Sequence, residues 1–335
     1  MKTSSIRDEL ESNASEIKEF ILSILEGEPK DLYQASAHYI ISGGKRLRPF
    51  MVVKSCEMFG GSSKRALPAA AAVEMVHNFS LVHDDIMDND DMRHSVPTVH
   101  KYYGMPLAIL AGDILFSKAF QLLAVNGRKA GLAEKAISEM ITRLSTACIY
   151  VCEGQAADVN MASNKMFSSE SQYINMIGKK TAALFEVSCA LGVLSAVDPN
   201  MEDVENLSSF GKNVGIAFQL IDDLIGIIGD PKITGKAVGN DIREGKNTYP
   251  ILLALNHARG ENKEKILKVF RSKDASSTDL DEAARTISAI GIDQHVRDAA
   301  KAHIDRAIKS IENYDNSGAK KALESSAKFI VERSM

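Results

Sequence analysis

The chain has 335 residues, of which 45% are hydrophobic and 25% are charged, and it carries a formal net charge of −4 at pH 7. This composition is typical of a globular protein and excludes a largely disordered chain. The small net charge excludes a global electrostatic attraction to nucleic acid or to an anionic membrane. An anionic substrate must therefore be bound by a local cluster of cations or metal ions.

The N-terminus and the cysteines indicate a cytoplasmic protein. Four acidic residues fall within the first 16 positions, which is unlike a secretory signal. No apolar run approaches the roughly 20 residues that span a bilayer. Cys148 and Cys152 share a helix face, and we interpret them as reduced core residues because no nearby histidine or cysteine completes a metal site. We therefore expect no transmembrane segment and no disulfide framework.

Long helices are predicted along most of the chain. The eight prolines leave residues 107–198 and 251–335 without one, and proline would break a helix interior. Apolar residues recur at helical spacing in residues 107–123. Asn126-Gly127 is interpreted as a helix-to-helix turn, because it lacks the alternating apolar flanks of a hairpin. With no fixed repeat and no low-complexity linker, the pattern predicts one all-α domain over residues 1–335.

Residues 43–49, Gly-Gly-Lys-Arg-Leu-Arg-Pro, place three positive charges after a flexible glycine pair. Glycine lets the backbone approach a ligand, and Lys and Arg bind phosphate oxygens. A solvated basic turn is the alternative for this segment alone. His77 lies seven residues before Asp84, two helical turns back on the same face. A buried core histidine is the alternative there, and the presence of Lys45 and Arg48 favours a phosphate contact.

The first acidic cluster follows at the end of a predicted helix. Pro68 suits a first helical turn, and Ala69 to Met87 contain no helix breaker. Asp84 and Asp88 are four residues apart, so their carboxylates lie on one face about 6 Å apart, flanked by Asp85. The helix dipole disfavours anions at this end. Mg²⁺ would offset the repulsion, because it prefers carboxylate oxygens and bridges to substrate phosphates. A solvated acidic helix end is the alternative, and the apolar helix disfavours it.

Basic residues follow the first acidic cluster. Arg93 and His94 lie in a polar, loop-like stretch, residues 89–97. Further along, Lys179-Lys180-Thr181 are predicted to begin another apolar helical segment. These cations are candidates to bind the anion that the metal ions would hold.

The second acidic cluster is Asp222 and Asp223, on a helix predicted over residues 214–228 and terminated by Gly229-Asp230-Pro231. Gln219 lies three and four residues before the two aspartates, on the same face. A lone pair of aspartates is weak support for a site. Two such pairs, each in an apolar helix and each followed by a basic loop, are stronger, and we expect them to face one another across a helical bundle.

The second basic loop is not a nucleotide-binding loop. Gly235-Lys236 resembles the end of such a motif, but Gly229 is one residue too far away and Ala237 replaces the required Ser or Thr. The dinucleotide pattern GxGxxG is also absent from the sequence. Phosphate binding is therefore assigned to metal ions and side-chain cations.

Six motifs together resemble the trans-prenyltransferases, the farnesyl and geranylgeranyl diphosphate synthase family. The resemblance covers about residues 39–250 and implies an all-α bundle of long antiparallel helices around a deep central cavity, the isoprenoid synthase type, assembled as a homodimer. The motifs are Gly-Gly-Lys-Arg-Leu-Arg-Pro at 43–49, His-Asp-Asp-Ile-Met-Asp-Asn-Asp-Asp at 83–91, Gly-Gln-Ala-Ala-Asp at 154–158, Lys-Thr at 180–181, Phe-Gln-Leu-Ile-Asp-Asp at 218–223 and Gly-Asn-Asp-Ile-Arg-Glu-Gly-Lys at 239–246.

The resemblance implies a catalytic metal site for an allylic diphosphate. Asp84 and Asp88, with Asp222 opposite, would bind Mg²⁺, three ions per active site, and Asp85 would be a further catalytic residue. The cations implied to help hold this diphosphate are Arg93, Lys180 and Lys236, and Lys246 is a further candidate substrate-binding residue.

The resemblance also implies a second substrate, isopentenyl diphosphate, whose diphosphate would be bound by Lys45, Arg48 and His77. Loss of the allylic diphosphate leaves an allylic cation that the double bond of isopentenyl diphosphate attacks. Neutralisation of the leaving diphosphate and exclusion of water are what this chemistry requires. The residues implied to stand near the cation are Thr181 and Gln219, with Gln155 and Asp158 in support. Residues 230–247 are predicted to form a lid.

Two positions depart from the family pattern. Gly226 stands where the family usually has a third aspartate in the second cluster, and His94 stands in place of a second arginine. The charge of His94 would vary near neutral pH. We expect an active enzyme with altered metal binding, because Asp222 and both groups of cations remain.

The product is predicted to be geranylgeranyl diphosphate, with farnesyl diphosphate as the alternative. Phe79, five residues before Asp84, is bulky, and Ser80 is small. In this family, that pair resembles archaeal-type geranylgeranyl diphosphate synthases, with Phe79 as part of the floor below the growing chain. The alternative is that Phe79 is an ordinary core residue.

Two other functions remain open at the level of sequence. A class I terpene cyclase also uses an Asp-rich helix and magnesium, but it takes one diphosphate and has no use for Lys45, Arg48 and His77. A regulatory subunit without activity is supported only by Gly226, and the intact first cluster argues against it.

Overall fold

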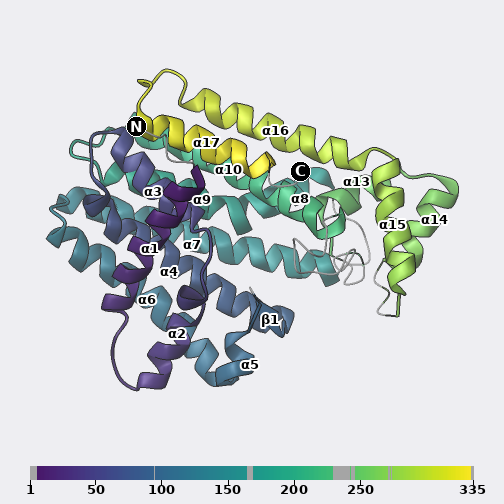
Figure 1. Cartoon of the computed structure of the whole chain (residues 1–335), viewed down its shortest axis with the longest axis horizontal. Coiled ribbons are helices and arrows are strands. Elements are labelled where there is room, and N and C mark those ends of the chain that lie inside the picture. Colours follow the sequence, from purple (N-terminus) through teal and green to yellow (C-terminus); the bar gives the residue numbers. More distant parts are fainter. Residues whose placement is uncertain are drawn as a thin grey trace. The chain divides into compact units, whose positions relative to one another are not determined.

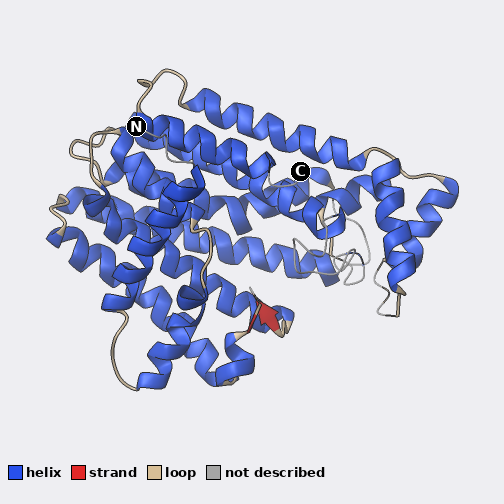
Figure 2. Cartoon of the chain, viewed as in Figure 1, coloured by secondary structure: helices blue, strands red, loops and turns tan. Residues whose placement is uncertain are grey.

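The computed structural model describes residues 6–93, 95–163, 169–228, 242, 246–270, 272 and 274–332. Helices make up most of this part of the chain (Figures 1 and 2), as the all-α prediction requires. They are α1 (Ile6–Ile24), α2 (Lys30–Ser42), α3 (Leu47–Met58), α4 (Ser63–Asp88), α5 (Val99–Tyr103), α6 (Met105–Lys129), α7 (Glu134–Ser163), α8 (Glu170–Ile177), the π-helix η1 (Gly178–Ala182), α9 (Ala183–Leu194), α10 (Met201–Ile228), α13 (Tyr249–His257), α14 (Gly260–Val269), α15 (Ser277–Ala289), α16 (Ile292–Ser310) and α17 (Gly318–Glu332).

The described residues form two compact units. Unit 1 comprises Met1–Cys148, Leu184–Gly211 and Ile311–Ser326. Unit 2 comprises Ile149–Ala183, Lys212–Ser310 and Ala327–Met335. The single domain and the deep central cavity that the sequence indicates stay predictions, so each unit is described by itself below.

Unit 1 is built on α4, which packs along α6 and α3. Ala69 to Ala72 in α4 are fully buried. Alanine has the highest helix propensity, and its small side chain lets neighbouring helices approach closely. Large side chains such as Phe50, Met75 and Leu115 fill the remaining core without any exposed surface. The sequence at the start of α4 therefore serves packing, whereas its C-terminal end carries Asp84 and Asp88.

The beginning of α4 differs from the prediction. The helix begins at Ser63, after an extended Ser62, so Pro68 lies in its second turn and not in its first. Proline has no N–H and removes one backbone hydrogen bond from the helix. The helix continues through this position because Ala66 and Ala69 beside it are fully buried, and packing outweighs the lost bond.

The turn predicted at Asn126-Gly127 lies further along the chain. Helix α6 continues to Lys129, and the turn is made by Gly131, which has a positive φ of 78°. Gly127 lies inside the helix, where an added Cβ would stand 3.3 Å from the side chain of Ile137 in α7. This glycine therefore serves close packing of two helices and not a turn.

Helix α6 also corrects the expectation that no segment approaches membrane-spanning length. By length and composition alone it is long and apolar enough to cross a membrane, although part of it is buried inside the protein. In the part of the chain that the structure describes, it is the one helix of this kind. A core helix meets the same criteria, and α6 packs against α4, α2 and α5.

Unit 2 contains helices that pack on one another. Helix α13 contacts α16, α14 and α8, and α14 packs against α15. Along α16 the residues Val296, Ala300, Ile304 and Ala307 form a buried stripe at helical spacing.

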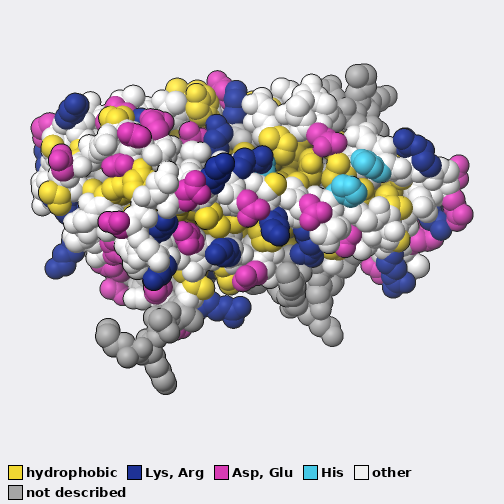
Figure 3. Space-filling view, turned by 90° about the horizontal axis from the view of Figure 1, so that it is seen from above, with side chains coloured by type: hydrophobic (Ala, Val, Ile, Leu, Met, Phe, Trp, Pro, Cys, Tyr) yellow, Lys and Arg dark blue, Asp and Glu magenta, His cyan; other side chains and the backbone are white. Residues whose placement is uncertain are grey.

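Acidic and basic side chains are interspersed over the face shown in Figure 3, in keeping with the small net charge.

Candidate active site

The first acidic cluster lies at the C-terminal end of α4. Asp88 is the last residue of the helix, and Asn89 closes it in a left-handed conformation with φ 54°. Asp84 is partly buried and Asp88 is exposed, whereas the side chain of Asp85 is only 1% exposed. The three aspartates therefore do not act alike, because Asp84 and Asp88 keep access to solvent and Asp85 points into the protein.

Asp85 forms a buried network with two residues from other elements. Its Oδ1 accepts a hydrogen bond from Arg93 Nε at 2.6 Å, and its Oδ2 accepts one from the Tyr39 hydroxyl. The Tyr39 oxygen in turn accepts the backbone N–H of Val99 at 3.3 Å. Burial raises the pKa of the Asp85 carboxyl, and the Arg93 charge opposes this rise. The structure thus places Asp85 where it orients Arg93.

A small hairpin carries Arg93. The stretch of residues 89–97 that was predicted as a loop contains β1 (Met92–Arg93) and β2 (Val96–Pro97), which pair antiparallel. Thr98 closes the hairpin, since its Oγ1 donates to the Asp90 carbonyl at 2.7 Å. Paired backbone groups hold the Arg93 side chain more firmly than an irregular loop would. His94 lies outside the described residues.

Arg48 and His77 lie side by side, as expected for two residues that bind one anion. Arg48 Nη1 is 3.4 Å from His77 Nε2, and the Arg48 guanidinium lies over the Phe185 ring at 4.2 Å from its centroid. Since Arg only donates, His77 accepts here through Nε2 when its ring is neutral. Lys45, the third predicted cation of this group, is exposed just before α3.

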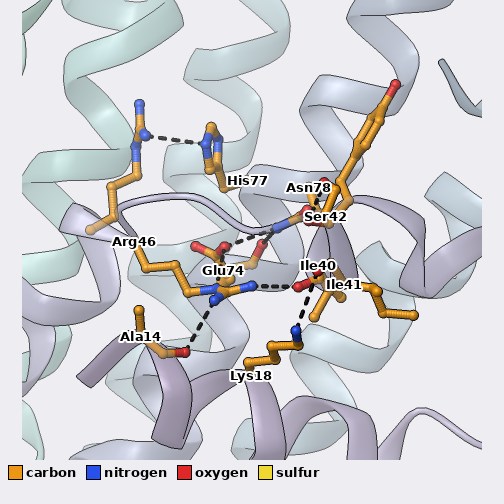
Figure 4. A network of polar contacts seen from close by, with 11 residues as sticks. Ala14, Lys18, Ile40, Ile41, Ser42, Arg46, Glu74, His77 and Asn78 are labelled. Atoms are coloured by element: carbon orange, nitrogen blue, oxygen red, sulfur yellow. Dashed lines mark hydrogen bonds and ion pairs between the residues drawn. The ribbon is translucent and has the colours of Figure 1, made fainter. Parts of the chain in front are cut away.

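Arg46 is buried and serves the structure of unit 1 (Figure 4). Its guanidinium contacts Glu74 Oε1 at 3.2 Å and donates to the carbonyls of Ala14 at 3.1 Å and Ile40 at 2.6 Å. Asn78 Nδ2 also donates to Glu74 Oε1 at 3.2 Å. Burial raises the pKa of Glu74, and Arg46 opposes that rise. Of the three cations at residues 43–49, one therefore fastens α1, α2 and α4 around the start of α3.

The glycine pair before Arg46 has a conformational role. Gly43 has φ 107° and Gly44 has φ 136°, conformations that residues with a side chain rarely adopt. The two glycines therefore provide a tight turn between α2 and α3. This turn lets Arg46 point inward while Lys45 stays exposed.

In unit 2, Lys180 and Thr181 lie in the π-helix η1. The prediction that they begin a helix is wrong, because the chain is already helical before them. The run from Glu170 to Leu194 is helical throughout, with η1 between α8 and α9. Single π turns within α-helices occur frequently at functional sites. Lys180 Nζ donates to Asp158 Oδ2 at 2.5 Å.

Gly154 of α7 makes this arrangement possible. A Cβ added at Gly154 would lie 2.2 Å from the backbone nitrogen of Lys180 and 2.6 Å from its Cα. Such distances are far below van der Waals contact, so only glycine allows α7 to approach η1 this closely. The predicted Gly-Gln-Ala-Ala-Asp motif therefore contributes both a close backbone approach and, four residues later, the Asp158 contact to Lys180.

Thr181 and Gln219, both predicted to stand near the reacting cation, contact one another. The Thr181 hydroxyl donates to Gln219 Oε1 at 2.8 Å, and Gln219 Nε2 donates to Asp223 Oδ1 at 2.7 Å. Asp223 Oδ2 accepts from the buried Tyr173 hydroxyl and from the Tyr249 backbone N–H, the latter at 3.2 Å. Burial, with the charge of Asp223, raises the pKa of Tyr173.

The remaining predicted residues of the second cluster are only partly described. Asp222 is exposed and Asp223 is 6% exposed, and Gly226 lies one turn further along α10. Lys246 lies in a described non-helical segment and is partly buried. Lys236 and most of the predicted lid, residues 230–247, lie outside the described residues.

Phe79 belongs to an aromatic cluster of α4 and α6. Its ring centroid is 5.0 Å from that of Phe116 and 4.7 Å from that of His83, and Phe120 lies 5.1 Å from Phe116. Phe79 is only partly buried. Phe79 therefore differs from the fully buried core residues of α4. It lies five residues, between one and two helical turns, before Asp84.

The carboxylates of the clusters fit Mg²⁺. No group of three or more His, Cys, Asp or Glu side chains that could by itself hold a metal ion occurs among the described residues. Mg²⁺ is usually bound by one or two carboxylates, with waters and substrate phosphates completing its octahedral shell. Asp84 and Asp88, one helical turn apart, provide such a donor set of hard oxygens.

Comparisons with known proteins agree with these features. A family model described as polyprenyl synthetase matches residues 29–287. A geranylgeranyl diphosphate synthase of Sulfolobus acidocaldarius is 41% identical over 95% of both chains, and a geranylfarnesyl diphosphate synthase of Aeropyrum pernix is 39% identical over 87% of this chain and 90% of that protein. The crystal structure of a geranylgeranyl pyrophosphate synthetase from Pyrococcus horikoshii matches with a TM-score of 0.90 at 40% identity, covering 98% of both chains.

Proposed function

The chain belongs to the polyprenyl synthetase family, and we propose that it condenses isopentenyl diphosphate with allylic diphosphates to give geranylgeranyl diphosphate. The observation that carries this proposal is the presence along helix α4 of two separate groups, one that can bind an anion directly and one that can bind it through metal ions. His77 with Arg48 forms one group, and Asp84 with Asp88 forms the other. Seven residues separate His77 from Asp84, about 10 Å along a helix. Two diphosphate sites are what a prenyltransferase needs and a terpene cyclase does not.

The allylic diphosphate is assigned to the acidic clusters. Asp84, Asp88 and Asp222 are proposed Mg²⁺ ligands, with three ions per active site. When bound, Mg²⁺ neutralises the charge that develops on the departing diphosphate. Arg93, which Asp85 holds in place, contributes a further positive charge. The other cations proposed to contact this diphosphate are Lys180, Lys236 and Lys246.

The second diphosphate is assigned to Arg48, His77 and Lys45. A guanidinium and an imidazole 3.4 Å apart can both contact one phosphate group. The allylic C–O bond breaks, and the double bond of isopentenyl diphosphate forms the new C–C bond to the allylic carbon. Loss of a proton then restores a double bond in the longer chain. Thr181 is proposed to face the allylic carbon while positive charge is present there.

A primer assay tests the proposed activity. The purified chain is incubated with Mg²⁺, isopentenyl diphosphate and an allylic primer of five, ten or fifteen carbons, and the products are separated by length. We expect turnover with each primer and a C20 end product. Turnover of an allylic diphosphate without isopentenyl diphosphate would favour a cyclase. Binding of substrates without any turnover would favour a regulatory subunit.

Product length is proposed to depend on Phe79. Its partly exposed ring, tilted by 53° against that of Phe116, lies on α4 close to Asp84, where a growing chain would pass. Phe79→Ala removes the ring, and we expect products longer than C20. An unchanged C20 product from this variant would show that Phe79 is an ordinary packing residue and that another residue ends the chain. A C15 product from the wild-type protein would support the farnesyl alternative.

We also propose that the protein is a cytoplasmic homodimer. Helix α6 exposes several large apolar side chains, among them Met105, Ile109 and Leu110, the last of which is 50% exposed. Such a row on one helix is unfavourable in water and typical of a subunit interface. Analytical ultracentrifugation tests this proposal, and a monomer at micromolar concentration would contradict it. The small net charge remains the argument against a nucleic acid partner.

A further inference from the structure

In unit 2 a continuous line of hydrogen bonds ends at Thr181. It begins at the hydroxyl of Tyr173 and passes through Asp223 and Gln219 to the Thr181 hydroxyl. Tyr173 is 2% exposed, Asp223 is 6% exposed and Thr181 is 8% exposed, so bulk water has little access to these groups. The members of the line therefore depend on one another for their orientation.

The chemistry of Asp223 determines the direction of the line. Each of its oxygens faces an N–H group that cannot accept: Oδ1 faces Gln219 Nε2, and Oδ2 faces the Tyr249 backbone N–H. Both oxygens therefore accept hydrogen bonds in this arrangement. Gln219 then turns its NH2 group toward Asp223 and its amide oxygen toward Thr181. Thr181 uses its one hydrogen for Gln219, and the lone pairs of Oγ1 stay free of that bond.

This direction matters for a reaction that passes through an allylic cation. An oxygen lone pair stabilises a nearby positive charge, whereas the hydrogen of the same hydroxyl would destabilise it. Thr181 lies in the π turn η1, next to Lys180. An arrangement that is fixed before the reaction needs no reorganisation when the charge develops.

We propose that Asp223 and Tyr173 are positioning residues for the condensation, which fix the Gln219 amide so that Thr181 presents lone pairs, and not its hydrogen, to the allylic cation. The inference rests on the function proposed above and extends it to residues without direct substrate contact. Tyr173 and the Tyr249 N–H occupy Oδ2, and so they leave Oδ1 for Gln219.

Asp223→Asn tests the direction of the line. The substitution replaces one carboxylate oxygen by an NH2 group. This NH2 group fits better on the side of Gln219 than on the side of the Tyr173 hydroxyl and the Tyr249 N–H, where two donors already converge. Gln219 must then flip its amide and present NH2 to Thr181, whose hydrogen turns away from Gln219. We expect kcat to fall about 100-fold, the usual effect of one misdirected polar group in a transition state. The KM values for both diphosphates should stay unchanged, because the residues proposed to bind them are intact.

Gln219→Glu is the reciprocal variant. Alone, it places two carboxylates against each other and should also lower kcat. Combined with Asp223→Asn, the new carboxylate accepts from the new amide and from Thr181, so the net charge and the direction at Thr181 are those of the wild-type protein. We expect the double variant to recover kcat to within about 10-fold of wild type, because the two sites are coupled.

The assay measures kcat and both KM values for the wild-type protein and the three variants, with thermal unfolding midpoints as the control for folding. Losses in both single variants that the double variant reverses support the proposal. A wild-type kcat in Asp223→Asn, or losses that the double variant does not reverse, overturn it. If Asp223→Asn does not fold, Tyr173→Phe replaces it, and an unchanged kcat there overturns the proposal. A wild-type protein without turnover would instead contradict the proposed function, a result that the wild-type assay identifies separately.

Discussion

The two acidic clusters share a buried tyrosine–aspartate pair and differ in the other groups that contact the aspartate. In each cluster a buried aspartate directly follows one that is accessible to solvent, and it accepts a hydrogen bond from a buried tyrosine. Asp85 accepts from Tyr39 and Asp223 accepts from Tyr173. On the other carboxylate oxygen the first cluster has a guanidinium and the second has an amide.

This difference matches two different tasks. A carboxylate that holds Arg93 keeps a full positive charge at a fixed place, which suits the binding of an anion. A carboxylate that accepts from Gln219 adds no cation to the site. It orients the Gln219 amide and, through it, the Thr181 hydroxyl, whose lone pairs suit a nearby positive charge. The second aspartate of each pair is therefore better described as an organiser of a neighbouring group than as a further metal ligand.

The largest expected effect comes from removing an accessible aspartate of the first cluster. Asp84→Ala deletes a proposed Mg²⁺ ligand, and we expect kcat to fall by at least about 1,000-fold, because the leaving diphosphate loses its neutralising charge. Steady-state assays over a Mg²⁺ titration measure this loss. The exposed Asp281 of α15 provides a control, and Asp281→Ala should behave like wild type. An active Asp84→Ala protein would show that the comparison assigns the metal to the wrong cluster.

The same substitution in both clusters distinguishes their tasks. Asp85→Asn removes the charge that holds Arg93, and a charged hydrogen bond contributes about 1.5–3 kcal/mol, or roughly 10- to 100-fold. We expect this factor mainly in the KM for the allylic diphosphate, whereas Asp223→Asn should act on kcat. The KM for isopentenyl diphosphate serves as the internal control, because Arg48 and His77 are untouched. If both variants changed the same constant, the two clusters would not have separate tasks.

A smaller effect is expected from disturbing the second cluster's surroundings through the backbone. Gly154→Ala places a methyl group 2.2 Å from Lys180 N, so α7 and η1 must move apart. Overpacking of this kind destabilises proteins by about 1–3 kcal/mol, and misplacement of Thr181 should lower kcat about 10-fold. Thermal unfolding and kcat are measured together.

A matched control for this change lies in η1 itself. Gly178 has φ −56°, and a Cβ added there meets no atom within 4 Å. Gly178→Ala should therefore leave kcat unchanged and stabilise the fold by up to about 1 kcal/mol. Equal behaviour of the two alanine variants would mean that the close approach at Gly154 has no part in holding Thr181.

Local spacing predicted the accessible half of each cluster, and long-range contacts made up the rest. Asp84 and Asp88 share a helix face because they are four residues apart, which the sequence alone reveals. Tyr39 and Tyr173 were missed because their partners are 46 and 50 residues away, and no periodicity encodes such a contact. Two consecutive aspartates in an apolar helix cannot both face solvent. This pattern is the signal that could have prompted a search for a buried hydrogen-bond donor to the second aspartate.

The basic turn at residues 43–49 shows the same limit. Its composition alone does not distinguish its three cations, and the structure buries Arg46 while Lys45 is exposed and Arg48 is partly buried. The positive φ angles of Gly43 and Gly44 turn the chain and decide which side chains face inward. Local composition carries no information about that choice, because it depends on Glu74 in a different helix.

The smallest expected effect comes from Gly226, which stands in the second cluster where the first cluster has the aspartate Asp88. Asp222 and Gly226 are four residues apart on α10, as Asp84 and Asp88 are on α4. Gly226→Asp would complete the second cluster. In a helix, aspartate is favoured over glycine by about 0.3–0.5 kcal/mol, and repulsion from Asp222 costs about the same. We therefore expect little change in stability and a kcat within about 3-fold of wild type.

The informative measurement for this variant is the Mg²⁺ concentration that gives half-maximal activity. An added carboxylate beside Asp222 should lower it, since each further oxygen ligand strengthens the binding of a hard cation. Gly226→Asn has nearly the same size without the charge and should leave the Mg²⁺ requirement where it is in wild type. If both variants lost activity equally, the size of the side chain would be the cause. Glycine would then be required at position 226 because a larger residue does not fit there. If only the aspartate variant lowered the requirement, the first cluster would bind more of the metal in the wild-type protein than the second.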